Sequence, residues 1–297
     1  MTASAARPGA SVAALAAALA VVAAAAAGEP VRVGIDAGHG NYHTAAGRYA
    51  PFAELVRADG GEVTDVTATF TAAGLADLDL LVIANALAPA NRDRWSLPTP
   101  SAFTAGEIAA VAAWVAAGGR LLLIADHMPF PGAAGALAAA FGIVMDNGFV
   151  VGARDDGILR FDAGDSTLAA HPIVRGGDGD APIPFVLSFT GHAFRVEAGR
   201  DAQPLLVVPA GAVMLLPETA WEFSETTPRR DAAGLWQGAA LIVGDGRVAV
   251  FGEAAMFTSQ ATRPGHAAIG FDHPEATWNR QFARNVIRWL VGELPAR

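Results

Sequence analysis

Eight polar residues that could do chemistry follow short apolar segments, where strands are predicted to end. In chain order they are Asp36, His39, Asn41 and His43 after residues 31–35, Asn85 after residues 78–84, Asp126 and His127 after residues 121–125, and Glu253 after residues 247–251. In an open parallel sheet, ligands bind beyond the carboxyl ends of the strands. We therefore expect these groups to converge on one crevice, which is the main indication of function in this sequence.

His39 and His43 are the sharpest pair for metal binding. Together with Asp36 or Asp126 they could hold a divalent metal such as zinc and leave one position open for water. The sequence does not identify the cofactor, and two alternatives stay open. The rings could contact a polar ligand or do acid–base work, or they could bond the backbone of a loop whose glycines permit tight turns. We predict Asp36, His39 and His43 as metal ligands.

Three further residues are candidates for catalysis. Asp126 and His127 could form a dyad in which the carboxylate orients the imidazole, and Glu253 could act as a general base or a ligand. The alternative is that Asp126 caps the following turn and that Glu253 is a hydrogen-bonded carboxylate at a strand end. Polar residues predicted to bind the ligand are Asn41, Asn85 and His192.

Composition limits the classes of protein to which the chain can belong. Hydrophobic residues make up 53% of the 297 residues and charged residues 16%, which indicates a packed globular protein. The net charge is −9 without a basic stripe, so a nucleic-acid partner is not expected. The chain has no Cys, which excludes disulfides, thiolate nucleophiles and Cys-ligated metal sites. Trp95, Trp221 and Trp236 could line a sugar-binding rim or belong to the core.

Residues 1–28 have the pattern of a secretory signal peptide. Arg7 precedes an apolar run over residues 11–27, and small residues lead into Gly28. The alternative is an uncleaved anchor, because the run approaches the length that spans a bilayer. We expect cleavage near Ala27, a periplasmic or secreted mature protein in bacteria, and no stable membrane span after cleavage.

The mature chain alternates strands and helices in its first half. Strands are predicted over residues 31–35, 62–66, 78–84 and 121–125, with helices over 49–58, from 105 to 117 and over 133–141. Thr104 and Glu107 form a capping box at the start of the second of these helices. This order predicts βαβ units and an open, mainly parallel, doubly wound α/β sheet of the flavodoxin-like type.

The second half has a different pattern. Short apolar runs between Gly, Pro and Asp residues over 143–235 predict antiparallel strands that decorate the sheet. Residues 240–251 predict a hairpin around Gly244-Asp245-Gly246, and residues 277–291 a terminal amphipathic helix. We treat residues 29–297 as a single domain, with 143–235 as an insertion.

Several segments together resemble a known family. They are Asp36-Ala37-Gly38-His39-Gly40-Asn41-Tyr42-His43-Thr44, Leu80–Asn85, His171-Pro172-Ile173, and Gly246–Glu253 followed by a terminal helix that contains Asn279. In this order they resemble bacterial DUF4350-type proteins of the class I glutamine amidotransferase-like superfamily, which includes ThuA-like proteins. The resemblance implies that fold. It does not imply amidotransferase activity, because the turn that would hold the catalytic Cys contains Asp126, His127 and Met128.

One strand and its loop also resemble a second family. Ile35-Asp36-Ala37-Gly38-His39-Gly40 is similar to the opening motif of zinc-dependent N-acetylmuramoyl-L-alanine amidases. That resemblance implies that His39 is a metal ligand and that Glu54 stands where the family has its Glu. No later segment resembles that family's second-His strand.

Two classes of function remain open on the sequence. The first is an exported hydrolase with a His/Asp/Glu site, metal-assisted or not. The second is a non-catalytic module that binds a carbohydrate or an envelope partner on a degenerate amidotransferase-like fold. Either class implies a small-molecule or carbohydrate ligand, and fold alone does not separate them.

Overall fold

The computed structural model describes Met1 and residues 29–154, 156–261 and 267–297. Residues Val31–Arg297 form one compact unit. The predicted signal peptide lies almost wholly outside the described residues. No helix in the described part of the chain is long and apolar enough to cross a membrane.

Five parallel strands form the centre of the molecule. They are β1 (Arg32–Asp36), β2 (Glu62–Val66), β3 (Leu80–Ala84), β4 (Arg120–Ile124) and β14 (Gly246–Phe251), in the sheet order β2-β1-β3-β4-β14. Every residue of β3 is buried, as expected for a parallel strand covered on both faces. The carboxyl ends of all five strands therefore lie at one edge of the sheet.

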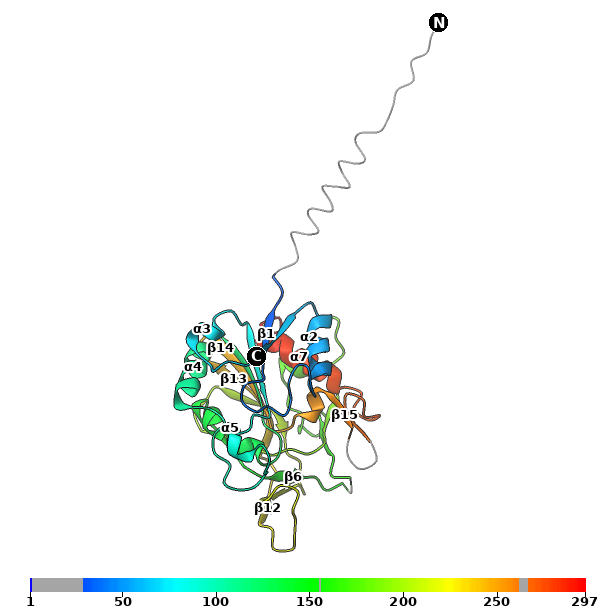
Figure 1. The fold of residues 1–297 in the computed structure, drawn as a ribbon. Helices are drawn as coiled ribbons and strands as arrows, with labels where there is room; N and C mark the ends of the chain where they lie inside the picture. Colours follow the sequence, from blue (N-terminus) through cyan, green and yellow to red (C-terminus); the bar gives the residue numbers. More distant parts are fainter. Residues whose placement is uncertain (2–28, 155, 262–266) are drawn as a thin grey trace. The chain divides into compact units, whose positions relative to one another are not determined.

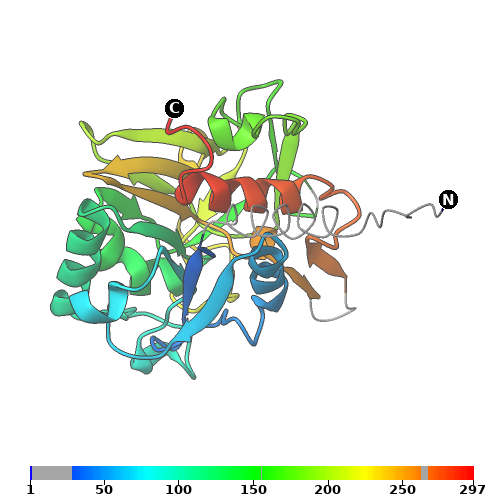
Figure 2. The same cartoon turned by 90° about the horizontal axis from the view of Figure 1, so that it is seen from above.

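Helices cover both faces of this sheet (Figure 2). On one face, α2 (Ala50–Ala58) and α7 (Asn279–Leu290) pack Phe52 and Phe282 into a core with Val82 of β3. On the other, α3 (Ala72–Leu75), α4 (Ala105–Ala116) and α5 (Phe130–Ala140) pack against Ile83 and its neighbours. Side chains of a strand alternate between its faces, so one strand contributes to both cores. The predicted doubly wound α/β fold is confirmed.

The predicted antiparallel part is also present. β13 (Trp236–Val243) runs antiparallel to β14 and extends the main sheet through β9 (Phe194–Val196) to β5 (Ile143–Met145), while β10 (Ala202–Val207) also pairs with β13. Smaller sheets are formed by β12 (Arg229–Asp231), β11 (Val213–Leu215) and β6 (Phe149–Val151), by β7 (Leu159–Asp162) and β8 (Phe185–Ser188), and by β15 (Ser259–Ala261) and β16 (Ala268–Gly270). Short helical turns are η1 (Pro89–Asn91), α6 (Pro172–Arg175) and η2 (Ala255–Phe257). The sheet with β6 and β12 lies at one end of the unit (Figure 1).

The start of α4 shows how local sequence sets an element boundary. The Thr104 hydroxyl accepts from the Glu107 amide, and the Glu107 carboxylate accepts from the Thr104 amide. This is the predicted capping box, which satisfies two amides that have no partner within the helix. It also fixes the Glu107 side chain, which has a second contact described below.

Candidate functional site

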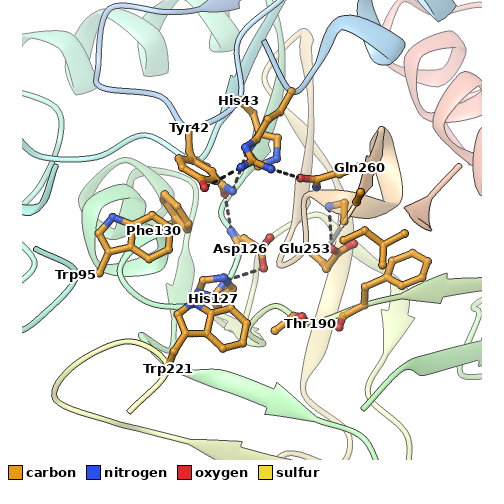
Figure 3. A pocket seen from close by; sticks show the side chains of 16 residues that line it. Tyr42, His43, Trp95, Asp126, His127, Phe130, Thr190, Trp221, Glu253 and Gln260 are labelled. Atoms are coloured by element: carbon orange, nitrogen blue, oxygen red, sulfur yellow. Dashed lines mark hydrogen bonds between the residues drawn. The ribbon is translucent and has the colours of Figure 1, made fainter. Parts of the chain in front are cut away.

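A pocket of about 370 Å³ lies beyond the carboxyl ends of β1, β3, β4 and β14 (Figure 3). Five of the predicted site residues line it: His43, Asn85, Asp126, His127 and Glu253. The remaining lining residues are Tyr42, Arg48, Trp95, Phe130, Phe189, Thr190, Trp221, Ala255, Gln260, Ala261 and Ile269. The expected convergence of groups from separate strands therefore occurs for five of the eight.

Glu253 lies two residues beyond β14 and is 1% exposed. Its two carboxyl oxygens accept hydrogen bonds from the Ala255 and Met256 amides, at 2.7 Å each, and so begin η2. Burial and the nearby charge of Asp126 raise the pKa of Glu253 well above its ordinary value, and they outweigh the two amide hydrogen bonds, which lower it. A protonated carboxyl can accept both amides and still donate its own proton. Asp126 and Glu253 are called the carboxyl pair below.

Asp126 does not orient the imidazole of His127, so the predicted dyad is wrong. One Asp126 carboxylate oxygen accepts from the His127 backbone amide at 2.8 Å, which is the capping alternative. The His127 ring instead places Nδ1 2.7 Å from the Met128 carbonyl oxygen. A carbonyl only accepts, so Nδ1 carries a proton and donates it to this oxygen. The ring stacks on Phe149, with centroids 4.5 Å apart, and meets Trp221 edge-on at 4.6 Å.

Asn85 connects the two sides of the pocket. It follows β3 in the left-handed region, at φ 53°, which is uncommon for a residue other than Gly. Its Oδ1 accepts from the Asp126 amide at 2.8 Å, and its Nδ2 lies 3.0 Å from His43 Nδ1. The amide of Asp126 can only donate, which fixes the orientation of the Asn85 carboxamide. Nδ2 must then donate, so His43 Nδ1 accepts and Nε2 carries the ring proton.

His43 is therefore held in its neutral form. Burial, and then the charges of Arg48 and His127, lower the pKa of His43 to about 3, although Gln260 acts in the opposite direction. Its Nε2 is buried and makes no hydrogen bond within the described part of the chain.

His39 does not line the pocket. Its Nδ1 lies 2.9 and 3.0 Å from the Asp36 carboxylate oxygens, and its Nε2 lies 2.8 Å from Glu107 Oε1. The ring sits between Phe70 and Phe103, at centroid distances of 4.6 and 4.7 Å. Both ring nitrogens are occupied, so this arrangement joins the loop after β1 to the start of α4. Asp36, His39 and Glu107 are called the His39 triad below.

The contacts within the His39 triad shift the pKa values of His39 and Glu107. Burial alone would lower the pKa of His39, but hydrogen bonds and charges from Asp36 and then Glu107 outweigh it and raise the pKa. Burial would raise the pKa of Glu107, but hydrogen bonds from Thr104, His39 and the Phe70 amide lower it to about 2. The protonated imidazole between two carboxylates is thus the favoured state of the triad.

The predicted metal site of Asp36, His39 and His43 is not assembled. Asp36 and His39 bond each other within the triad, whereas His43 lies in the pocket. Across residues 29–154, 156–261 and 267–297, no three His, Asp or Glu side chains are grouped to hold a metal ion. Glu54, which the amidase resemblance singled out, is exposed on α2 and does not line the pocket. His39 and His43, four residues apart in the loop after β1, therefore contact different neighbours.

Two predicted ligand-binding residues also lie outside the pocket. Asn41 donates from Nδ2 to Asp36 at 2.9 Å, and its Oδ1 accepts from the His39 amide. His192 is fully buried, and its Nδ1 lies 3.1 Å from the Asp126 carbonyl oxygen. Burial lowers the pKa of His192 to about 4. Both residues support the backbone that carries the site and do not line the pocket.

Sequence reasoning missed several residues of the pocket. Tyr42, Arg48, Thr190 and Gln260 come from loops and from β15, where no strand-end pattern marked them. Trp95 and Trp221 do line the pocket, as one reading of the tryptophans suggested. Trp236 packs instead against the core between the sheet and its helices.

Trp95, Phe130 and Trp221 lie on one side of the pocket, and Glu253 and Thr190 lie on the other (Figure 3). Trp221 is 55% exposed, and its φ of 69° is an outlier for a bulky residue. Backbone strain of this kind is retained where the surrounding structure fixes it, often at ligand sites. The pocket therefore has an apolar wall opposite the carboxyl pair.

Comparison with known proteins supports the fold alone. No family model matches the chain, and no curated protein matches it. Among solved structures, the mmIFT52 N-terminal domain has a TM-score of 0.62 at 15% identity, over 87% of this chain and 97% of that one. A cytoplasmic protein from Salmonella typhimurium has a TM-score of 0.52 at 13% identity, over 88% and 98%. A ThuA-like protein from Bacteroides uniformis has a TM-score of 0.46 at 11% identity, over 91% and 96%.

The two solved structures with TM-scores above 0.5 support the overall α/β fold of the chain and nothing narrower. The narrower resemblance to DUF4350-type proteins has no matching family model. The turn after β4 holds Asp126 and His127, and the chain contains no Cys. Function must therefore be argued from the pocket itself.

Proposed function

We propose that this chain is an exported hydrolase that cleaves a glycosidic bond in the pocket, with the carboxyl pair as its acid and base. The observation that carries the proposal is that one pocket holds two carboxyl groups in unlike environments. Glu253 is buried and held by two amides, while Asp126, at 8% exposed, accepts one amide. Burial and the charge of Asp126 raise the pKa of Glu253, and a carboxyl that keeps its proton beside a second carboxyl group forms with it the usual pair for acid–base hydrolysis.

The chemistry assigns a distinct role to each carboxyl. Protonated Glu253 donates its proton to the glycosidic oxygen as the bond from that oxygen to the anomeric carbon breaks. A water molecule forms the new bond to that carbon, and its proton passes to Asp126. The products are a free sugar and an alcohol, and solvent returns the proton from Asp126 to Glu253. His127 Nε2 contributes a ring nitrogen that can form a hydrogen bond with a sugar hydroxyl.

The aromatic wall supports a sugar as the ligand. A sugar ring has apolar C–H faces and polar edges, and the pocket has Trp95 and Trp221 on one side and carboxyl groups on the other. Such a mixed lining, with a few polar groups that set orientation, is typical of small-molecule sites.

A specific observation favours a second candidate, a non-catalytic carbohydrate-binding module. Both Glu253 oxygens already hold the amides that begin η2, so this carboxyl has a structural task independent of any reaction. Export belongs to both candidates and rests on the pattern of residues 1–28 alone.

The test is hydrolysis of a panel of p-nitrophenyl glycosides by wild type and by Asp126→Asn. Asn can still accept the His127 amide, so the fold should tolerate this change. If the chain is such a hydrolase, the turnover of Asp126→Asn should be lower than that of wild type by a factor of about 10²–10⁴. Asp245→Asn, an exposed change in the β13–β14 turn, should leave turnover unchanged. Sugar binding that survives in Asp126→Asn, with no turnover in wild type, would favour the binding module.

A further inference from the structure

Arg48 gives the pocket a positive charge. Its NH1 donates to Gln260 Oε1 and its NH2 to the Tyr42 hydroxyl, each at 2.9 Å. Its guanidinium carbon also lies 4.4 Å from the centroid of the Tyr42 ring. Both hydrogen-bond partners are uncharged groups, and no ion pair among the described residues includes Arg48.

The two hydrogen bonds of Arg48 orient its guanidinium but use only some of its N–H donors. Arginine has five N–H donors in a planar fork, and two of them bind Gln260 and Tyr42. The other three have no acceptor within the part of the chain that the structure describes. A guanidinium that is already oriented loses less side-chain freedom when a ligand binds. Its remaining donors suit a planar, two-oxygen acceptor such as a carboxylate.

The charges around Arg48 restrict the ligand further. Among the described residues that line the pocket, Arg48 carries the only guanidinium or ammonium group, and His43 beside it is held neutral. One cation matches a monoanion, whereas a phosphate dianion is usually met by several donors or cations. The negative charge of Asp126 repels an anion. A negatively charged group would therefore bind at the Arg48 side, with the aromatic wall beside it.

We propose that Arg48 binds the carboxylate of an acidic sugar, so that the substrate class is a glycoside of the uronic acid type. This inference rests on the proposed function for the bond that is cleaved, but the binding preference can be tested without turnover. Tyr42 and Gln260 act as positioning residues, because they hold the guanidinium from two sides.

The test compares two ligands that differ in one group, methyl β-D-glucuronide and methyl β-D-glucoside. Affinities for the full chain are measured by titration calorimetry or ligand-observed NMR. We expect the glucuronide to bind about tenfold tighter or more, with a preference that weakens as salt is added. In Arg48→Gln the ratio should fall to about one, and Arg48→Lys should keep part of it.

Arg57→Gln is the matched control. Arg57 lies on the exposed side of α2 and does not line the pocket. Its replacement by Gln changes the net charge by the same amount as Arg48→Gln. It should keep the wild-type ratio. Thermal unfolding of each variant shows that the fold is retained.

Several results would overturn the inference. Equal affinities in wild type, no binding of either sugar, or an unchanged ratio in Arg48→Gln would each do so. Tighter binding of D-glucose 6-phosphate than of D-glucuronate would overturn the carboxylate class. An Arg48-dependent preference without any hydrolysis would support this inference and contradict the proposed hydrolase. Hydrolysis of neutral glycosides that Arg48→Gln leaves unchanged would do the reverse.

Discussion

At the scale of single residues, the pocket depends on how protons are distributed among buried groups. Burial and the charge of Asp126 raise the pKa of Glu253, and burial and the charge of Arg48 lower the pKa of His43 to about 3. Asn85 links Asp126 and His43 across the pocket, because its carboxamide can accept from the Asp126 amide and donate to His43 in one orientation only. Each state follows from a named neighbour, so each can be changed by one substitution.

Removing the charge of Asp126 should lower the pKa of Glu253. Burial would remain, but the charge that acts with burial to hold the proton on Glu253 would be gone. The measurement is the ¹³C chemical shift of the Glu253 carboxyl carbon against pH, in wild type and in Asp126→Asn. An identical titration in the two proteins would show that the carboxyls do not interact.

Replacing Glu253 with Gln should destabilise the fold by about 1–3 kcal/mol, because the carboxamide NH₂ cannot accept one of the two amides that begin η2. Urea unfolding measures the loss. Glu54→Gln, on the exposed side of α2, makes the same chemical change and should lie within about 0.5 kcal/mol of wild type. A neutral Glu253→Gln variant would contradict the capping role of Glu253.

His39 should make stability depend on pH in the neutral to alkaline range. Its pKa is raised in the folded state, so the folded protein holds the proton more tightly than the unfolded chain does. This contribution is complete below the unfolded pKa, near 6.5, and is lost as pH rises through the folded value. We expect the free-energy difference between wild type and His39→Gln to shrink as pH rises from the unfolded histidine value through the folded one.

Comparing the two proteins isolates His39 from other groups. The pKa values of His43, His171 and His192 are lowered to about 3, 4 and 4, so these residues act mainly below the unfolded histidine value. Glu253 acts in both proteins alike. A difference that stays constant with pH would show that the His39 triad is not ionised as described.

At the scale of elements, the His39 triad ties the loop after β1 to the start of α4. That loop continues directly into Tyr42 and His43 in the pocket. Glu107 takes part in both the capping box and the triad, with one oxygen on His39 and the other on Thr104. The Glu107 carboxylate therefore helps to fix both the start of α4 and the loop that leads to Tyr42 and His43.

Thr104→Ala tests this link. Losing the cap should destabilise the protein by about 1 kcal/mol, as measured by thermal or urea unfolding. The Thr104 hydroxyl also lies 2.8 Å from Glu107 Oε2, so its loss should loosen the carboxylate as well. The control is Thr69→Ala, because Thr69 is exposed and its side chain makes no hydrogen bond with the described residues. This change should leave the free energy of unfolding nearly unchanged. If both variants unfold alike, the capping box contributes nothing to stability.

At the scale of the whole molecule, the unit Val31–Arg297 contains both cores and the pocket. The residues before it are predicted, from their pattern, to direct export and then to be removed.

Expression of the full chain in a secreting bacterial host tests this prediction. Mass spectrometry of the purified protein should find an N-terminus near Gly28, in the periplasmic or extracellular fraction. Leu19→Arg, which interrupts the apolar run, should leave an uncleaved protein in the cytoplasm. An intact N-terminus in the membrane fraction of wild type would instead favour the anchor.

The sequence by itself determined the elements, because periodicity, caps and turn residues act over a few neighbouring positions. The parallel strands, the capping box at Thr104 and the terminal helix all follow from such local patterns. It also placed Asn85, Asp126 and Glu253 at one edge of the sheet, since parallel strands share their carboxyl ends. Only the tertiary structure decided where loop residues point. It paired His39 with Glu107, 68 positions away, and brought Arg48 to Gln260, 212 positions away. Contacts between such distant residues depend on how loops fold over the sheet, which no short-range pattern encodes.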